Sequence, residues 1–181
     1  MAARRQARKR GVMPYRFMVV AEDGLGAELL GALAELLSTS LDEGERYRGR
    51  AWRTLRPAFR VVALDGAGAP AGQASCFWVP CQPACRLIGL GDVAVAPVHR
   101  RRKVAATACA LAIAEAWRLH AGAVLAKTTL LRTVLSDLGF EASTNGPFFY
   151  VEDGRRTAHP DWMAAVRSPL PSSLRLEEGD F

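Results

Sequence analysis

Four consecutive cations, Arg100 to Lys103, mark the stretch of this sequence best suited to bind an anion. They follow segment 87–95, whose continuous apolar character predicts a strand buried on both faces. They precede an Ala-rich segment that predicts a helix over about 102–119. The N–H groups that start a helix lack partners within it and carry the positive end of its dipole. We therefore expect the N–H groups from about Arg101 to Ala106, with the neighbouring cations, to bind a phosphorylated ligand; the alternative is a cationic loop that is only solvated.

A sheet flanked by helices is predicted to position this stretch. Apolar runs between turn residues predict the strands, and Leu residues at helical spacing predict the first helix. The charged segment 42–58 is a second helix or a loop. The expected strands are 15–21, 60–64, 72–79, 87–95, 123–127, 148–151 and 162–166, and the expected helices are 25–38, 102–119 and 129–140. Strand 87–95, its helix and strand 123–127 predict one βαβ unit with parallel strands, inside a mixed α/β sheet with helices on both faces.

The basic charge of the chain is concentrated near its N-terminus. The net charge is +6, but five of the 24 basic residues lie in the first ten, which leaves 19 basic against 18 acidic residues. We expect 1–13 to be a basic disordered tail and 14–181 to form a single domain. The near-neutral domain disfavours a nucleic-acid partner. No apolar run could span a bilayer and no secretory signal is recognisable, so we expect a cytoplasmic protein without a membrane partner.

The cysteines do not indicate a metal site. Cys81 and Cys85 are close in the sequence, but no second Cys/His pair stands at zinc-ligand spacing. Cys109 lies in the middle of the predicted helix and is interpreted as a small core residue. We therefore expect no metal ion.

The stretch around the cations resembles the central motif of the GNAT superfamily of N-acetyltransferases, whose pattern is Val-x-Pro-x-x-Arg/Gln-x-x-Gly-x-Gly/Ala. Val95, Pro97, Arg100 and Ala105 stand at the matching places, and residues 138–140 match the family's Leu-Gly-Phe. The resemblance implies a GNAT-like mixed sheet, mostly antiparallel, with one parallel βαβ unit and helices on both faces. It also implies transfer of an acyl group, most simply acetyl, from a coenzyme A thioester to an amine of a small molecule.

The same resemblance assigns a donor site. Main-chain groups of Val93 and Val95 would pair with the pantetheine arm of coenzyme A, and a backbone N–H near Val95 would stabilise the oxyanion. The phosphates would be held by the loop and the start of the helix, namely Arg100, Arg101, Arg102, Lys103, Val104 and Ala105.

Two positions depart from the family pattern. Lys103 replaces the first glycine of the motif, which elsewhere lets the backbone approach the phosphate closely. Leu135 stands where many members carry a Tyr that protonates the leaving thiolate. The proton donor is therefore water, another side chain, or absent.

Acyl transfer to an amine also requires a base near the thioester. Asp92, at the edge of the predicted central strand, is the candidate base, and a structural hydrogen bond to a neighbouring loop is its alternative role. His99 is either a proton relay or a contact for ligand or solvent. Aromatic residues and acids near the C-terminus are candidates to contact the acceptor, although a core position is favoured for each aromatic ring. They are Tyr47, Trp52, Phe77, Trp78, Phe148, Phe149, Tyr150, Glu177, Glu178 and Asp180.

Short pieces of the sequence are similar to two branches of the family. The acidic Gly-Asp-aromatic end is similar to the aminoglycoside 2'-N-acetyltransferases, and segment 56–72 is similar to the nodulation N-acyltransferases. The second branch takes acyl chains from an acyl carrier protein, whose acidic surface would suit the cations. The donor is thus coenzyme A or, alternatively, an acyl carrier protein or aminoacyl-tRNA; a non-catalytic binding module of this fold is the third alternative. The oligomeric state, a homodimer included, is left open.

Overall fold

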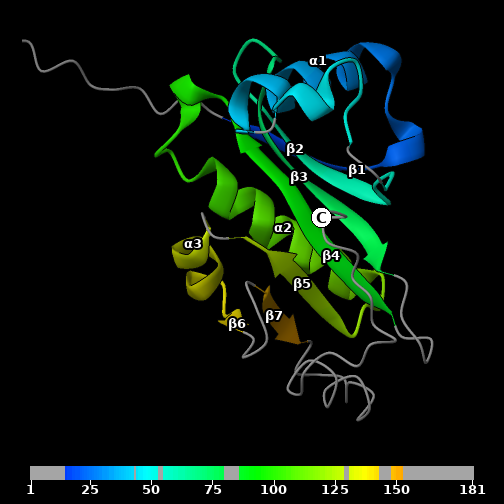
Figure 1. Ribbon diagram of the computed structural model, residues 1–181, viewed down its shortest axis with the longest axis vertical. Helices are drawn as coiled ribbons and strands as arrows, with labels where there is room; N and C mark the ends of the chain where they lie inside the picture. Colours follow the sequence, from blue (N-terminus) through cyan, green and yellow to red (C-terminus); the bar gives the residue numbers. More distant parts are fainter. Residues whose placement is uncertain are drawn as a thin grey trace, which may run out of the picture.

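The computed structural model of the chain describes residues 15–42, 44–52, 55–79, 86–128, 131–142 and 148–152. Its strands form one seven-stranded sheet in the order β1-β2-β3-β4-β5-β7-β6 (Figure 1). They are β1 (Arg16–Ala21), β2 (Phe59–Leu64), β3 (Pro70–Val79), β4 (Leu87–Val95), β5 (Ala123–Lys127), β6 (Glu141–Ala142) and β7 (Phe148–Glu152). Neighbouring strands are antiparallel except β4 and β5, which are parallel. The sheet is therefore mostly antiparallel with one parallel unit, as predicted.

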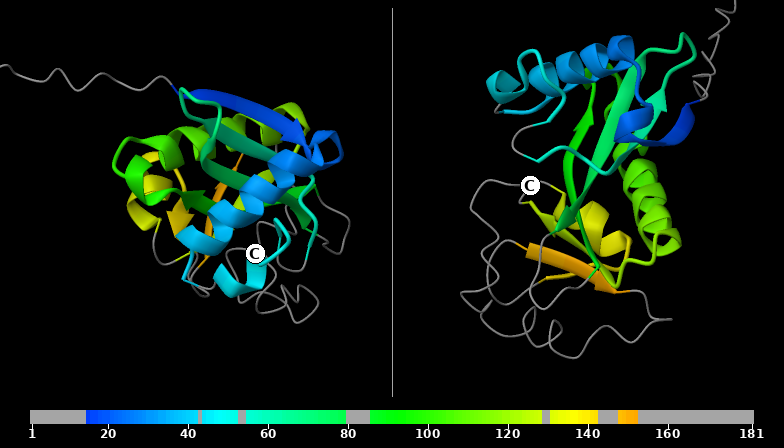
Figure 2. Two further views of the ribbon diagram at one scale, coloured as in Figure 1. Left: turned by 90° about the horizontal axis from the view of Figure 1, so that it is seen from above. Right: turned by 90° about the vertical axis from the view of Figure 1, so that its right-hand side faces the viewer.

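Helices cover both faces of the sheet (Figure 2). They are α1 (Ala27–Ser40), α2 (Val104–Arg118) and α3 (Arg132–Asp137), with 3₁₀ turns η1 (Glu22–Gly24), η2 (Gly44–Tyr47) and η3 (Pro97–His99). Successive side chains of a strand point to opposite faces. Val62 of β2 accordingly packs with α1, whereas Val61 packs with α2. The predicted fold class is confirmed.

The strands of the βαβ unit have the predicted bounds, but the helix between them does not. It begins at Val104 rather than near 102, because Arg101 and Lys103 adopt positive φ angles of 61° and 62° that a right-handed helix cannot contain. The N–H groups that start the helix therefore begin at Val104, and residues 101–103 belong to the loop before it.

The remaining differences concern shorter elements. Segment 42–58 contains the single turn η2 in its described part, and α3 occupies only the middle of 129–140. Strand β6 was not predicted from the sequence. The proposed strand 162–166 and the basic tail 1–13 lie outside the described residues.

A bulge interrupts β4 where it separates from β5. Ser75 of β3 faces Gly91 and Gln73 faces Ala94, so two residues of β4, Asp92 and Val93, oppose a single residue of β3. The described pairing of β4 with β5 covers Leu87–Leu90 only, although β4 continues to Val95. The β5-facing edge of residues 91–95 thus opens beside the centre of the sheet.

Two cysteines belong to the core on the α2 side of the sheet. Cys76 and Cys109 are both fully buried. Burial raises the pKa of the Cys109 thiol to about 12 and the pKa of Cys76 well above its ordinary value. Both thiols therefore stay protonated at neutral pH. The burial of Cys109 confirms it as a core residue.

Within the described residues, no helix is both long and apolar enough to cross a membrane.

Candidate functional site

The cationic stretch forms the connection between β4 and α2. Arg101, Arg102 and Lys103 are exposed, and no side chain caps the helix that follows them. The N–H of Thr107 donates to the carbonyl of Lys103 (3.0 Å), which leaves Val104, Ala105 and Ala106 without a partner inside the helix. Unpaired backbone N–H groups and three exposed cationic residues therefore lie at the same end of α2. This combination suits a phosphate or diphosphate group.

Lys103 has the backbone conformation that normally favours glycine. Its φ of 62° and ψ of 13° lie in the left-handed region, where the Cβ of a residue other than glycine comes too close to the following carbonyl oxygen. The glycine-like path of the loop is therefore kept despite the substitution, at a cost in conformational energy. Lys103 adds a charge at a position where the motif has none.

Lys103→Gly is expected to raise the free energy of unfolding by about 0.5–1 kcal/mol, because glycine adopts this conformation without steric cost. Urea denaturation measures the change. Arg102→Gly is the matched control, since Arg102 does not share the positive φ and glycine there only adds freedom to the unfolded chain. Equal destabilisation by both substitutions would contradict the left-handed conformation of Lys103.

Arg100 connects the end of β4 to the end of α1. Its Nε donates to the carbonyl oxygen of Val95 (3.3 Å) and its Nη2 donates to that of Ser40 (3.1 Å). Both contacts are to main-chain groups. The structure therefore gives Arg100 a role in holding the loop in addition to its charge.

The side chain of His99 is not exposed to solvent. Its side chain is buried in η3, where Nδ1 is 3.0 Å from the hydroxyl of Tyr15 and Nε2 is 3.8 Å from a carboxylate oxygen of Asp65. The expectation of a solvent contact is wrong, because the loop folds back over the end of the sheet near Tyr15 and Asp65. Through these contacts to Tyr15 and Asp65, His99 holds the loop between β4 and α2 against the sheet.

The main chain of Val93 and Val95 lies along the opened part of β4. Val93 is half-buried against the α2-side core, and Val95 pairs with Gly72 of β3 on the other edge of the strand. The two residues thus border the separation of β4 from β5.

Asp92 occupies the bulge with a left-handed φ of 46°. Its Oδ1 accepts a hydrogen bond from the hydroxyl of Tyr47, and its main-chain oxygen accepts one from Nε2 of Gln73 (3.1 Å). Unfavourable backbone conformations concentrate at functional sites, where surrounding contacts impose them. Asp92 is therefore a half-buried carboxylate held at the point where the sheet opens.

A buried polar network lies beside Asp92 and was not predicted from the sequence. Arg60 of β2 uses all five of its N–H donors: it binds both carboxylate oxygens of Glu22 (2.6 and 3.0 Å), Oε1 of Gln73 (2.8 Å), Oγ of Ser75 (2.9 Å) and the carbonyl of Ala51 (2.6 Å). One signal was present in the sequence, because Gln73 and Ser75 alternate with apolar residues and so share one face of their strand.

The remaining candidates are dispersed. Leu135 is fully buried in the α2-side core and offers no hydroxyl. Phe77 is buried, as favoured, whereas Trp78 is 40% exposed with the guanidinium of Arg86 over its ring. Tyr150 donates to Glu141 (2.9 Å). The side chains of Phe148 and Phe149, and the acids Glu177, Glu178 and Asp180, lie outside the described residues.

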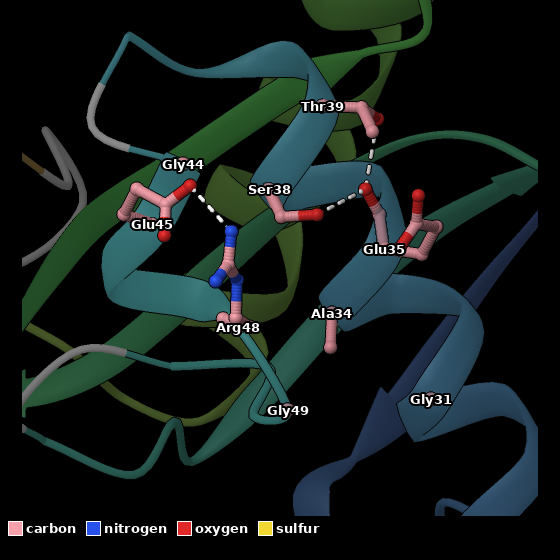
Figure 3. Close-up of a pocket in the computed structure, with 9 residues that line it drawn as sticks. All are labelled: Gly31, Ala34, Glu35, Ser38, Thr39, Gly44, Glu45, Arg48 and Gly49. Carbon is pink, nitrogen blue, oxygen red and sulfur yellow. Dashed lines mark hydrogen bonds and ion pairs between the residues drawn. The ribbon is translucent and has the colours of Figure 1, made fainter.

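A surface hollow of about 470 Å³ lies between α1 and the segment after it (Figure 3). None of its lining residues is a predicted site residue: they are Gly31, Ala34, Glu35, Ser38, Thr39, Gly44, Glu45, Arg48 and Gly49. Arg48 and Glu45 pair with each other across 2.7 Å, and the hydroxyls of Ser38 and Thr39 donate to the main-chain oxygen of Glu35. These four side chains are thus paired within the hollow. Among the described residues, no group of three or more His, Cys, Asp and Glu could hold a metal ion; Cys81 and Cys85 lie outside them.

Comparison with solved structures identifies the fold as that of the GNAT acetyltransferases. A GNAT family N-acetyltransferase from Escherichia coli, solved with CoA, superimposes with a TM-score of 0.62 at 15% sequence identity. The match covers 77% of this chain and 82% of the E. coli chain. A GNAT family acetyltransferase from Brucella melitensis, solved with acetyl-CoA, has a TM-score of 0.57 at 17% identity over 80% of this chain and 92% of its own.

An aminoglycoside acetyltransferase from an uncultured soil metagenomic sample has a TM-score of 0.60 at 17% identity over 73% of this chain and 95% of its own. No protein-family model matches the sequence, and no curated protein matches it. The family resemblance of the sequence is thus confirmed in the fold.

Proposed function

We propose that this protein is an N-acetyltransferase that transfers the acetyl group of acetyl-CoA to an amine of a small molecule. The observation that carries the proposal is the continuity of the opened edge of β4 with the cationic start of α2. A pantetheine arm pairing with residues 91–95 would lead its diphosphate directly to the N–H groups at Val104 and Ala105. Two of the structures with this fold were solved with CoA or acetyl-CoA.

In this proposal the donor is held chiefly by the main chain. Val93 and Val95 pair with the pantetheine, and the N–H near Val95 stabilises the tetrahedral oxyanion. Val104 and Ala105 bind the diphosphate through their N–H groups. The exposed side chains of Arg101, Arg102 and Lys103 add charge-assisted bonds, while Arg100 supports the loop through its contacts to Val95 and Ser40.

Asp92 is the proposed general base. Its carboxylate belongs to the bulge of β4, next to the separation of β4 from β5, and accepts a hydrogen bond from Tyr47 of the α1-side core. An amine that approaches the thioester from the α1 side would meet this carboxylate. The acceptor side of the site is formed by the segment after α1, which packs on that face.

A carrier-protein donor is the second candidate. Three exposed cations beside the site would complement the acidic surface of an acyl carrier protein, which presents the same phosphopantetheine thioester. Release of CoA from acetyl-CoA with an amine panel supports the first candidate. Turnover only with an acylated carrier protein supports the second.

The double variant Arg101→Ala/Arg102→Ala is expected to weaken acetyl-CoA binding by about 10-fold, because it removes charge-assisted bonds from an exposed site. Calorimetric titration measures the affinity at two salt concentrations, and the wild type should lose more affinity on adding salt than the variant. The control is Arg16→Ala/Arg118→Ala, which removes two exposed charges from β1 and the far end of α2. Equal affinity in both double variants would contradict the donor site.

A further inference from the structure

Acetyl transfer from a thioester to an amine requires a group that moves protons, and the side chain of Leu135 cannot do so. When the amine nitrogen bonds to the thioester carbon, it must lose a proton, and the departing sulfur must gain one. Leu135 is fully buried among apolar side chains, so the α3 position commonly used by the family has no exchangeable proton here. The path has to lie elsewhere.

The chain has three tyrosines, and the structure places each of them. The Tyr15 hydroxyl lies 3.0 Å from Nδ1 of His99, and the Tyr150 hydroxyl donates to Glu141. Tyr47 is the one whose hydroxyl donates to Asp92, the carboxylate at the bulge of β4. Tyr47 therefore contacts the strand at the point where β4 separates from β5. It does so from the α1 side of the sheet, whereas Leu135 lies on the α2 side.

The protein holds both partners of this pair rigidly. The Tyr47 ring is 2% exposed in the α1-side core. The turn η2 that carries Tyr47 is pressed onto α1 at Gly44, where a Cβ would lie 1.8 Å from the main-chain oxygen of Ser38. On the other side of Tyr47, Arg60 holds the carbonyl of Ala51. Asp92 itself is held through its main-chain oxygen by Gln73.

We propose that Tyr47 is the positioning residue of Asp92, and that this pair replaces the missing tyrosine at 135 as the proton path. The inference rests on the proposed acetyltransferase activity. As the C–N bond forms, Asp92 takes the proton that the amine releases. As the C–S bond breaks, the carboxylic acid returns that proton to the thiolate, so the carboxylate is regenerated and Tyr47 keeps its own proton.

The hydrogen bond from Tyr47 fixes the orientation of the Asp92 carboxylate. Tyr47→Phe keeps the ring and removes the hydroxyl that donates to Asp92. We expect kcat to fall by about 10- to 100-fold, with the KM for acetyl-CoA within about twofold of the wild type, because the donor is bound elsewhere.

Asp92→Asn supplies the second arm of the test, because its amide oxygen can still accept from Tyr47 and preserves the packing. We expect it to lower kcat by about 10²- to 10⁴-fold. In the Asp92→Asn background, Tyr47→Phe should cause no further loss, since the tyrosine acts only through the carboxylate. Should Tyr47→Phe not fold, a retained kcat in Asp92→Asn would by itself overturn the inference.

The outcomes separate this inference from the proposed function. Wild-type turnover together with additive losses, or with a normal rate in Tyr47→Phe, would overturn the role of the pair and uphold the acetyltransferase. Absence of wild-type turnover with acetyl-CoA and the whole amine panel would overturn both. Non-additive losses with an unchanged KM for acetyl-CoA would establish the pair.

Discussion

Glu22→Gln is expected to lower the free energy of unfolding by about 3–5 kcal/mol. Arg60 is fully buried and Glu22 is 3% exposed, and the two form a bidentate pair at 2.6 and 3.0 Å. The amide of Gln carries no charge and turns donors toward the guanidinium. A buried cation would then remain without its counter-ion, which costs far more than the loss of an exposed ion pair. Urea denaturation monitored by circular dichroism measures the change.

Asp23→Asn is a closely matched control, because the same carboxylate-to-amide change is made at the neighbouring residue. Asp23 pairs with Arg56 across 2.9 Å, but the two side chains are 87% and 55% exposed. Such surface pairs contribute about 0–1 kcal/mol. If Glu22→Gln proved no more destabilising than Asp23→Asn, the buried network around Arg60 would not exist in solution.

The network also has a functional consequence. Arg60 joins the carbonyl of Ala51 to Gln73, and Gln73 in turn holds the main chain of Asp92. The segment that carries Tyr47 and the strand that carries Asp92 are thereby fixed to the same buried cation. Loss of Glu22 should therefore disturb the Tyr47–Asp92 pair as well as stability.

The sequence was sufficient to predict the strands and the cationic stretch that border the proposed donor site. Strands 87–95 and 123–127 have the expected bounds, because Pro97 and Gly122 limit two mostly apolar segments. The position of the cations between a strand and a helix also followed from chain order alone. These features are local, so the residues that determine them are neighbours in the sequence.

The contacts that complete the site are not local. Tyr47 and Asp92 are 45 residues apart, and Glu22 and Arg60 are 38 apart. Segment 42–58 lacks a clear periodicity, so nothing in it predicted that its tyrosine would turn toward the sheet. The left-handed conformation of Lys103 was equally hidden, because lysine does not favour positive φ.

Gly72→Ala is expected to weaken acetyl-CoA binding by about 10-fold and to lower the free energy of unfolding by about 1–3 kcal/mol. Gly72 lies where β3 meets the end of β4 and the start of α2. A Cβ there would lie 2.8 Å from Cγ1 of Val104, 2.9 Å from the main-chain oxygen of Ala94 and 3.2 Å from Cγ2 of Val95. The methyl group can be accommodated only by moving β4 or the first residue of α2. Calorimetric titration and urea denaturation measure the two effects.

Gly31→Ala tests whether these losses come from the crowded contact or from the substitution itself. Gly31 lies within α1, and a Cβ there would meet nothing within 4 Å. Alanine is the better helix former, so this variant should gain about 0.5–1 kcal/mol and bind acetyl-CoA as the wild type does. Val104→Ala in the Gly72→Ala background should recover part of the affinity, because it removes one of the two closest contacts while the Ala94 oxygen remains. Full affinity in Gly72→Ala alone would mean that the donor does not depend on where α2 begins, which contradicts a diphosphate held by its N–H groups.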